Sequence, residues 1–322
     1  MDFQTPLEQL LLTTTRIVVE RNGQFGIGTG FIYSHETKEG SAPFLVTNKH
    51  VVAGVSKGRF NFLQGDEKTQ LPKLGEAINV EVDQFQDRFF GHPKEEIDLA
   101  VMPLVPVLQE LEKAGNRIFF RSLSQELIPS EEQLKSLQAM EEITILDYPS
   151  GMIDQKNLLP LIRRGTTASP PELDFSGGPV FMVNAPMFPC SGGSPVFIIN
   201  TQGYVSKQGF VPEVRMIFLG VLSQVALRSE AGEIEMGVIP NGPLPPTIKK
   251  QITDMGVALR SSLVVETIEA FMAKVEEMQG GNGEPATPAA TPVPDTPQKE
   301  ESSPKESPME QPDQSSLKAT PE

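Results

Sequence analysis

The sequence predicts a mostly β protein made of antiparallel barrels or a sandwich. Short apolar or alternating runs bounded by Gly, Pro, Asn and Asp follow one another along the body of the chain, about a dozen in all. Turn residues support the same fold class, because Asn22-Gly23 and Gln202-Gly203 each stand between two of these runs. Helical segments are few, and no internal repeat is visible.

The strand candidates share one pattern, in which apolar residues fill the run or alternate along it. In chain order they are Arg16–Glu20, Gly28–Ser34, Phe44–Asn48, Arg59–Leu63, Ile78–Phe85, Asp98–Leu104, Arg117–Leu123, Glu142–Asp147, Leu159–Ala168, Pro179–Asn184, Pro195–Asn200, Met216–Leu227 and Met236–Ile239. Short strands of this kind, separated by turn signals at regular spacing, favour antiparallel sheets.

Helices are expected at a few places between and after the strands. The shorter ones are Leu7–Thr15, Val107–Ala114, a helix capped by Ser130 ahead of Glu131 and Glu132, and Pro246–Thr253. A longer helix over 262–278 closes the body, because its apolar residues recur at three- and four-residue spacing. A single apolar stripe of this kind predicts a helix packed on the barrels rather than one that lies in a membrane or binds a partner.

The segment Gln279–Glu322 differs in composition from the rest of the chain. It has no aromatic residue, only Leu317 as a large aliphatic, and three basic against eight acidic residues. Such a segment buries too little apolar surface to offset its ordering entropy, so we expect a disordered, Pro-rich, acidic tail. Its Thr-Pro and Ser-Pro pairs suit phosphorylation or recognition by a partner, and a solubilising spacer explains the same composition.

Charge and composition exclude several function classes. The chain has 27 Lys and Arg against 42 Asp and Glu, a net charge of −15, which argues against nucleic acid as a partner. A single cysteine, Cys190, allows no internal disulfide, and the N-terminus lacks both a signal-peptide pattern and a membrane span. Three scattered histidines and no phosphate loop predict no metal and no cofactor. We therefore expect a soluble, cytoplasmic protein with no membrane partner.

Local motifs in a fixed order point to the chemistry. They are GTGF (Gly28–Phe31), LVTNKHVV (Leu45–Val52), EEIDLAVMPL (Glu95–Leu104) and FPCSGGSPVF (Phe188–Phe197). Together they place a His at the end of one apolar strand, an Asp at the start of another, and a Ser-Gly-rich turn before a third. This is the His, Asp, Ser order of one known solution to acyl transfer.

At these residues the chain resembles the trypsin-like serine peptidases of the chymotrypsin fold, in particular an intracellular bacterial branch without disulfides. Glu141–Ser169 and Pro179–Pro189 also resemble segments of that branch. The resemblance implies a peptidase domain over 1–278 that contains two antiparallel six-stranded β-barrels. The first barrel is expected over about 16–110, the second over about 115–260, and the helix 262–278 and the tail 279–322 follow them.

The resemblance also implies roles for particular residues. His50 takes the position of the general base, which removes the serine proton and gives it to the leaving amine. Asp98 takes the position of the aspartate that orients the imidazole, and it is chosen over Glu95 and Glu96 because it directly abuts the apolar strand. Ser223 is similar to the family's serine that steadies this aspartate. The implied substrate is a peptide or a protein.

The nucleophile turn departs from the family's pattern, which is commonly Phe-Pro-Gly-x-Ser-Gly-Ser-Pro-Val-Phe. Aligned without a gap, Gly192 holds the nucleophile position. A shifted alignment makes Ser191 the nucleophile, but the second oxyanion donor then falls on Pro189, which has no N–H. Cys190 is a third candidate nucleophile, since thiolates replace serine in some relatives.

Two hypotheses follow from this turn. In the first, the protein is a serine endopeptidase with His50, Asp98 and Ser191 as its triad, impaired or rearranged, with an oxyanion hole formed by the backbone N–H groups around Cys190, Ser191 and Gly192. In the second, it is a catalytically inactive pseudopeptidase that binds a peptide or a protein. The turn leaves both open, and the endopeptidase is the preferred prediction because the expected fold and two of the three triad positions are intact, with the pseudopeptidase as the alternative.

Overall fold

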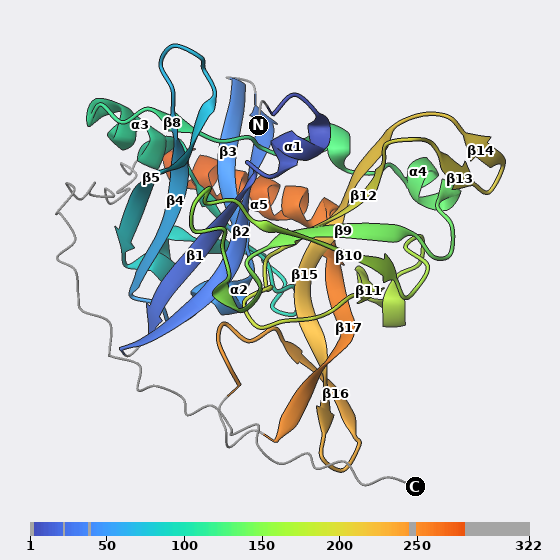
Figure 1. Ribbon diagram of the computed structural model, residues 1–322. Coiled ribbons are helices and arrows are strands. Elements are labelled where there is room, and N and C mark those ends of the chain that lie inside the picture. Colours follow the sequence, from blue (N-terminus) through green and yellow to red (C-terminus); the bar gives the residue numbers. More distant parts are fainter. Residues whose placement is uncertain (1–2, 22, 38–39, 245–248, 281–322) are drawn as a thin grey trace, which may run out of the picture.

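The first strand-forming runs of the chain fold into one antiparallel sheet (Figure 1). The structure is a computed structural model that describes residues 3–21, 23–37, 40–244 and 249–280. The strands of this sheet are β1 (Thr14–Arg21), β2 (Gln24–Thr37), β3 (Gly40–Thr47), β4 (Lys57–Gly65), β5 (Pro72–Asp83), β6 (Phe90–Gly91), β7 (Ala100–Pro103) and β8 (Ile118–Phe119). Their order is β5-β4-β1-β2-β3-β7-β6, with β8 paired to β4.

This first sheet differs from the expected six-stranded barrel. Its end strands β5 and β6 are not paired with each other in the described ranges, and the 3-10 turn η1 (Phe85–Arg88) joins them. The Phe85 ring is fully buried and packs on Gly58, where a Cβ would lie 2.5 Å from the ring. An aromatic side chain therefore fills space at this side of the sheet, next to the end of β5.

The second sheet closes into a six-stranded barrel, as expected. Its strands are β9 (Glu142–Asp147), β10 (Leu161–Thr167), β11 (Val180–Asn184), β12 (Pro195–Asn200), β15 (Arg215–Ser229) and β17 (Lys250–Arg260). The order is β12-β9-β10-β11-β17-β15, and a β12–β15 pairing completes the circle. A further strand, β16 (Ile234–Val238), pairs with β15, and β13 (Tyr204–Ser206) and β14 (Gly209–Val211) form a separate hairpin.

The helices are α1 (Pro6–Leu10), α2 (Lys49–Val52), α3 (Val105–Lys113), α4 (Glu131–Ser136) and α5 (Ser262–Gly280). Ser130 caps α4 as predicted, since its hydroxyl accepts the Gln133 N–H in a reciprocal capping box. The predicted closing helix is α5, which runs behind the two sheets in Figure 1. Its buried residues Leu263, Val264 and Ile268 share one apolar core with strands of both sheets.

Two helix predictions need correction. The first predicted helix, Leu7–Thr15, ends at Leu10, because Thr14 and Thr15 already belong to β1 and pair with β2. The predicted helix Pro246–Thr253 is wrong where the structure describes it, because Lys250–Arg260 is strand β17, paired with both β11 and β15. These pairings use backbone groups of distant segments and outweigh the local preference.

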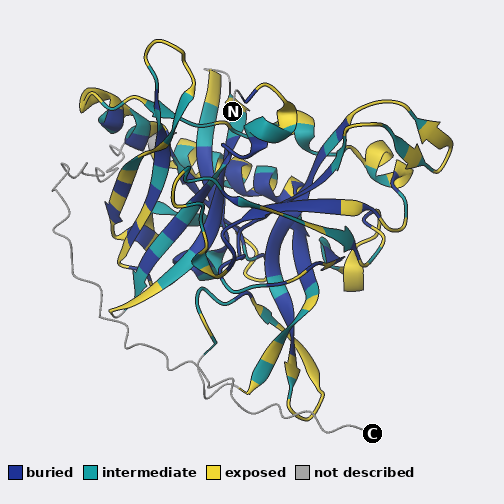
Figure 2. Ribbon diagram, in the orientation of Figure 1, coloured by how far each residue is buried: buried dark blue, intermediate teal, exposed yellow. Residues whose placement is uncertain are grey.

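Buried residues are concentrated inside the two sheets, and a few peripheral strands are exposed. Figure 2 shows buried centres in both sheets, whereas the β13–β14 hairpin and β16 are largely exposed. Among the described helices, none has both the length and the apolar composition needed to cross a membrane. From residue 281 onward, the predicted tail lies outside the described residues.

Candidate functional site

His50 lies between the two sheets, on the short helix α2 that follows β3. Its Nδ1 is 2.6 Å from Asp98 Oδ2, and its backbone N–H donates to Asp98 Oδ1 at 3.0 Å. The Asn48 amide donates to the Asp98 carbonyl oxygen at 2.7 Å, which fixes the two segments to each other. Because Nδ1 is engaged by the carboxylate, Nε2 is the nitrogen presented to the rest of the site.

Ser223 on β15 completes the support of Asp98 from the second sheet. Its hydroxyl donates to Asp98 Oδ2 at 2.7 Å, and the serine itself is buried. The structure therefore brings together His50, Asp98 and Ser223, three residues taken from the sequence. This arrangement holds an imidazole in one orientation beside a carboxylate, which suits a general base.

Gly192 is the residue that faces the free side of His50. A Cβ built on Gly192 would lie 2.7 Å from His50 Nε2 and 3.0 Å from Cε1. It would also lie 3.3 Å from the side-chain oxygen of Asn48. Nε2 has no hydrogen-bond partner among the described residues. The position opposite the imidazole thus carries no hydroxyl.

Ser191, the nucleophile of the shifted alignment, lies in a different environment. It is fully buried, and its Oγ accepts a hydrogen bond from the Arg163 guanidinium at 3.2 Å. Arg163 in turn donates to both oxygens of Asp147, from its Nε at 2.9 Å and from a terminal nitrogen, and Asp147 has no exposed surface. The structure therefore places the Ser191 side chain in a buried Arg163–Asp147 network and does not bring it to His50.

Cys190, the third candidate, is buried with its backbone in the left-handed region, at φ +71°. Burial, with a smaller contribution from the Asp147 charge, raises the pKa of the Cys190 thiol to about 11. The neutral thiol is a poor nucleophile. Its backbone N–H donates to the Pro240 carbonyl oxygen at 2.7 Å.

The GTGF motif holds the 190–193 turn in place. The Thr29 N–H donates to the Gly192 carbonyl at 3.0 Å, and the Thr29 hydroxyl donates to the Cys190 carbonyl at 3.3 Å. Gly193 has φ +86°, and a Cβ there would overlap the Thr29 carbonyl oxygen, so only glycine fits. Gly28 packs against Val51 of α2, where a Cβ would be 2.6 Å away. The motif thus fixes both the turn and the helix that carries His50.

A segment that the sequence analysis predicted in part as a strand, Met236–Ile239, but did not assign to the site crosses it. The Ile239 N–H donates to the Ser223 carbonyl at 3.0 Å, and the Asn241 carbonyl accepts from the Ile27 N–H at 2.6 Å. The Asn241 amide also donates to the His50 carbonyl at 3.2 Å. No motif marked these residues, because their contacts are made chiefly by backbone groups.

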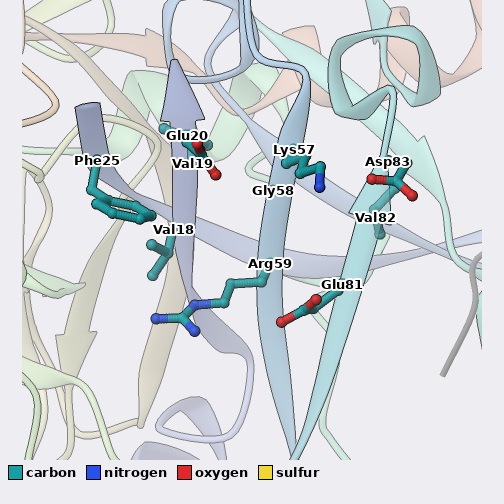
Figure 3. Close-up of a pocket in the computed structure, with 10 residues that line it drawn as sticks. All are labelled: Val18, Val19, Glu20, Phe25, Lys57, Gly58, Arg59, Glu81, Val82 and Asp83. Atoms are coloured by element: carbon teal, nitrogen blue, oxygen red, sulfur yellow. The ribbon is translucent and has the colours of Figure 1, made fainter. Parts of the chain in front are cut away.

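A hollow of about 240 Å³ lies on the first sheet and does not include these residues. Strands β1, β4 and β5 and the start of β2 form it, with Phe25, Arg59 and Glu81 among its lining (Figure 3). Phe25 is 74% exposed. Because none of the candidate catalytic residues lines it, this hollow is separate from the His50 site.

A comparison with known families agrees with the fold and the order of these motifs. A family model described as trypsin-like peptidase domain matches residues 28–205, more than half of the chain. The chain belongs to the trypsin-like peptidase family. The match includes His50, Asp98 and Gly192 and ends before β15, so Ser223 and the segment around Ile239 lie beyond it.

Solved structures similar to this trypsin-like domain include proteases. An HtrA-type protease, AlgW with a tripeptide, has 13% identity and a TM-score of 0.43, over 84% of this chain and 62% of that one. A serine endoprotease from Yersinia pestis has 9% identity and a TM-score of 0.45, over 84% and 66%. A scabies mite inactivated protease paralogue has 12% identity and a TM-score of 0.41, over 84% and 96%. The chain thus spans about three fifths of the HtrA-type protease. No curated protein matches the sequence.

Proposed function

We propose that this trypsin-like domain binds extended peptide segments and does not hydrolyse them. The observation that carries the proposal is Gly192, whose α-carbon faces His50 Nε2 where an attacking hydroxyl would be needed. The base position and its support by Asp98 and Ser223 are present. The other two candidate nucleophiles are both buried. Ser191 Oγ accepts a hydrogen bond from Arg163, and the raised pKa of the Cys190 thiol keeps it neutral.

The oxyanion site supports the same proposal. With Gly192 at the nucleophile position, the two donors are the N–H groups of Gly192 and of Cys190. The Cys190 N–H already donates to Pro240. Loss of one such donor lowers turnover by about 100- to 1,000-fold even where a nucleophile is present. The proposed site therefore has no nucleophile, and only one of its two oxyanion donors, the Gly192 N–H, is left for a substrate.

A serine endopeptidase that uses Ser191 is the second candidate function, favoured by the intact His50–Asp98–Ser223 arrangement. It requires Ser191 Oγ to leave the Arg163 guanidinium and turn toward His50. It also requires an oxyanion hole in which the residue two positions earlier, Pro189, donates nothing.

Fluorophosphonate labelling separates the two functions. Intact mass is measured after incubation of the wild type, Ser191→Ala and His50→Ala with the reagent. We expect no adduct on the wild type. An adduct on the wild type that disappears in both variants would overturn the proposal and establish the endopeptidase.

Peptide binding is measured by proton NMR of the histidine side chains. The chain has only three histidines, His35, His50 and His92, so their signals are easily assigned. Their Cε1–H signals in a proton NMR spectrum are assigned with single His→Asn variants. On titration with a degenerate octapeptide library, the His50 signal is expected to move while the other two stay in place. The mass spectrum of the library is expected to stay unchanged, and cleavage products would contradict the proposal.

A further inference from the structure

One edge of β15 is shared by two strands in succession. β12 pairs with its first part, from Arg215 to Val221, and β16 pairs with its second part, from Gln224 to Arg228. Between them lies Ser223, whose hydroxyl supports Asp98 and whose carbonyl accepts the Ile239 N–H. The segment Ile234–Asn241, here named the cis strand, thus adds to the sheet edge directly beside the site.

Past β16, the cis strand continues across the site in contact with three separate parts of the chain. Ile239 bonds to Ser223 of β15, Pro240 to Cys190 of the nucleophile turn, and Asn241 to Ile27 of β2. All three contacts are backbone hydrogen bonds of 2.6–3.0 Å. Strand addition to a sheet edge, as β16 makes on β15, is one way in which proteins bind an extended peptide, and the three backbone bonds prolong that contact across the site.

The Pro240 carbonyl lies where the carbonyl of a bound substrate would be expected. Its oxygen accepts from the Cys190 N–H, which is one of the two oxyanion donors when Gly192 holds the nucleophile position. In a hydrolysing relative this N–H is directed at the carbonyl of the substrate. A carbonyl of the chain itself therefore occupies that donor here.

One side chain of the cis strand is buried in the apolar core of the second barrel. Ile239 is 1% exposed and packs in the core of the second barrel, a cluster that includes Met187, Leu222 and Val225. Met187 lies over Gly256, where a Cβ would be 2.8 Å from its terminal methyl. The space next to Ser223 in this core is therefore filled by a branched aliphatic side chain.

The remainder of the cis strand is held weakly. Ile234, Met236 and Val238 are 67%, 43% and 48% exposed, so β16 is held by its ladder with β15 and by the ion pair between Glu235 and Lys250 of β17. Segments with few buried apolar contacts open locally at lower free energy than the whole fold. Release of β16 is therefore expected to cost less free energy than unfolding of either sheet, and release of the whole cis strand costs in addition the burial of Ile239.

We propose that the cis strand is an intramolecular occupant of the peptide cleft. The cleft then binds, in trans, an extended peptide with a branched aliphatic residue followed by proline. This inference rests on the proposed peptide-binding function and adds its ligand class and its regulation. Because a tethered segment competes at an effective concentration of about 1 mM, a cleft that binds the segment with a Kd of about 0.1 mM or below binds a peptide in trans at least about tenfold more weakly in the wild type than when opened.

The test uses the full chain with Ile234–Asn241 replaced by a Gly-Ser segment of equal length, the opened variant. A milder variant is Ile239→Ser, and its matched control is Ile217→Ser, a buried isoleucine of the same core, 4% exposed, on β15. Circular dichroism confirms that each variant is folded. The probe is a fluorescent peptide of residues 233–242, EIEMGVIPNG, and the control probe carries Asp at the position of Ile239.

Fluorescence anisotropy is expected to show the probe binding the opened variant at least tenfold more tightly than the wild type, with no binding of the Asp probe. Hydrogen exchange is expected to show that the Cys190 and Ile27 amides lose protection in the opened variant and in Ile239→Ser, but keep it in Ile217→Ser. Equal affinity of the probe for wild type and opened variant, or no binding to either, would overturn the inference.

The octapeptide library keeps the two proposals apart in the same experiment. Library binding to the opened variant without binding of the 233–242 probe leaves the proposed function standing and removes only the cis strand as its natural occupant. Absence of both library and probe binding to the folded opened variant overturns the proposed function itself.

Discussion

A hydroxyl restored at position 192 meets two obstacles at the scale of single residues. A Cβ at this position lies 2.7 Å from His50 Nε2, so the ring must shift, and the Cys190 N–H is held by Pro240. We expect Gly192→Ser to react with a fluorophosphonate about 100-fold more slowly in the intact chain than in the opened variant, because one oxyanion donor is worth about that factor. The rates are measured by intact mass, and equal rates would contradict an obstructing cis strand.

The Arg163–Asp147 pair below the turn is the second residue-scale feature. Asp147 is fully buried, and Arg163 is its ion-pair partner. Removal of the guanidinium by Arg163→Met leaves an uncompensated buried carboxylate, which costs about 3–5 kcal/mol. Urea unfolding measures this cost. The neighbouring Arg164→Met, at an exposed position, is the control and is expected to stay within about 0.5 kcal/mol of the wild type.

The thiol of Cys190 predicts a dependence of reactivity on pH. Its pKa is raised to about 11 by burial and by the Asp147 charge. Only about one thousandth of such a thiol is ionised at pH 8, and the thiolate is the reactive form. Iodoacetamide is therefore expected to leave the folded protein unmodified at pH 8 and to react about tenfold faster per pH unit above it. The same thiol in urea, with an ordinary pKa, is the control, and fast labelling of the folded protein would contradict the assignment.

At the scale of elements, α5 joins the two sheets through buried side chains, of which Ile268 is one. Ile268 is fully buried in the shared core, and Phe271 of the same helix packs edge-on against Phe44, with ring centroids 5.8 Å apart. Ile268→Ala is expected to lower the free energy of unfolding by about 2–5 kcal/mol, through lost burial and the cavity left behind. Met278→Ala, at a residue 57% exposed on α5, is the control and is expected to change it little.

Which elements were predictable from sequence depends on whether the deciding contacts are local. His50, Asp98 and Ser223 were found through the family resemblance, which rests on residues beside apolar runs, and the α5 stripe is local to one helix. β17 was mistaken for a helix, since its pairing partners in β11 and β15 lie far away in the sequence.

The orientation of the nucleophile turn could not be predicted from local sequence patterns for the same reason. The direction of Ser191 is set by Arg163, 28 residues away, and the Cys190 N–H by Pro240, 50 residues away. Contacts of this kind leave no periodicity and no motif in the sequence. The candidates could therefore be named from the sequence, but which of them faces His50 could not.

At the scale of the whole molecule, both sheets and α5 bury one common core. Its residues include Phe31 from β2, Phe197 from β12, Phe218 from β15 and Val264 from α5, and the rings of Phe31 and Phe218 lie 5.3 Å apart between the two sheets. The His50 site sits at the same junction, since Asp98 precedes β7 and Ser223 belongs to β15. Substitutions that destabilise this shared core are therefore expected to disturb the geometry of the His50 site as well.

His92 lies at this junction and makes its stability depend on pH. It is 3% exposed, its Nδ1 accepts the Lys94 N–H at 3.1 Å, and its Nε2 lies 3.4 Å from a Glu266 carboxylate oxygen on α5. Burial lowers the pKa of His92 below its ordinary value of 6.5; Glu266 opposes this, and the charges of Lys49 and Lys94 add to it. The folded protein therefore binds a proton at His92 less readily than the unfolded chain does.

The sign of the resulting stability change follows from linkage. Above pH 6.5 His92 is neutral in both states, and as the pH falls below 6.5 the unfolded chain takes up the proton first, so stability decreases. We expect the melting temperature to fall between pH 7 and pH 5, and to fall less steeply in His92→Asn, whose amide oxygen can accept the Lys94 N–H. His35→Asn, at a partly buried residue on β2, is the control and is expected to follow the wild type. An unchanged slope in His92→Asn would assign the acid loss of stability to other groups.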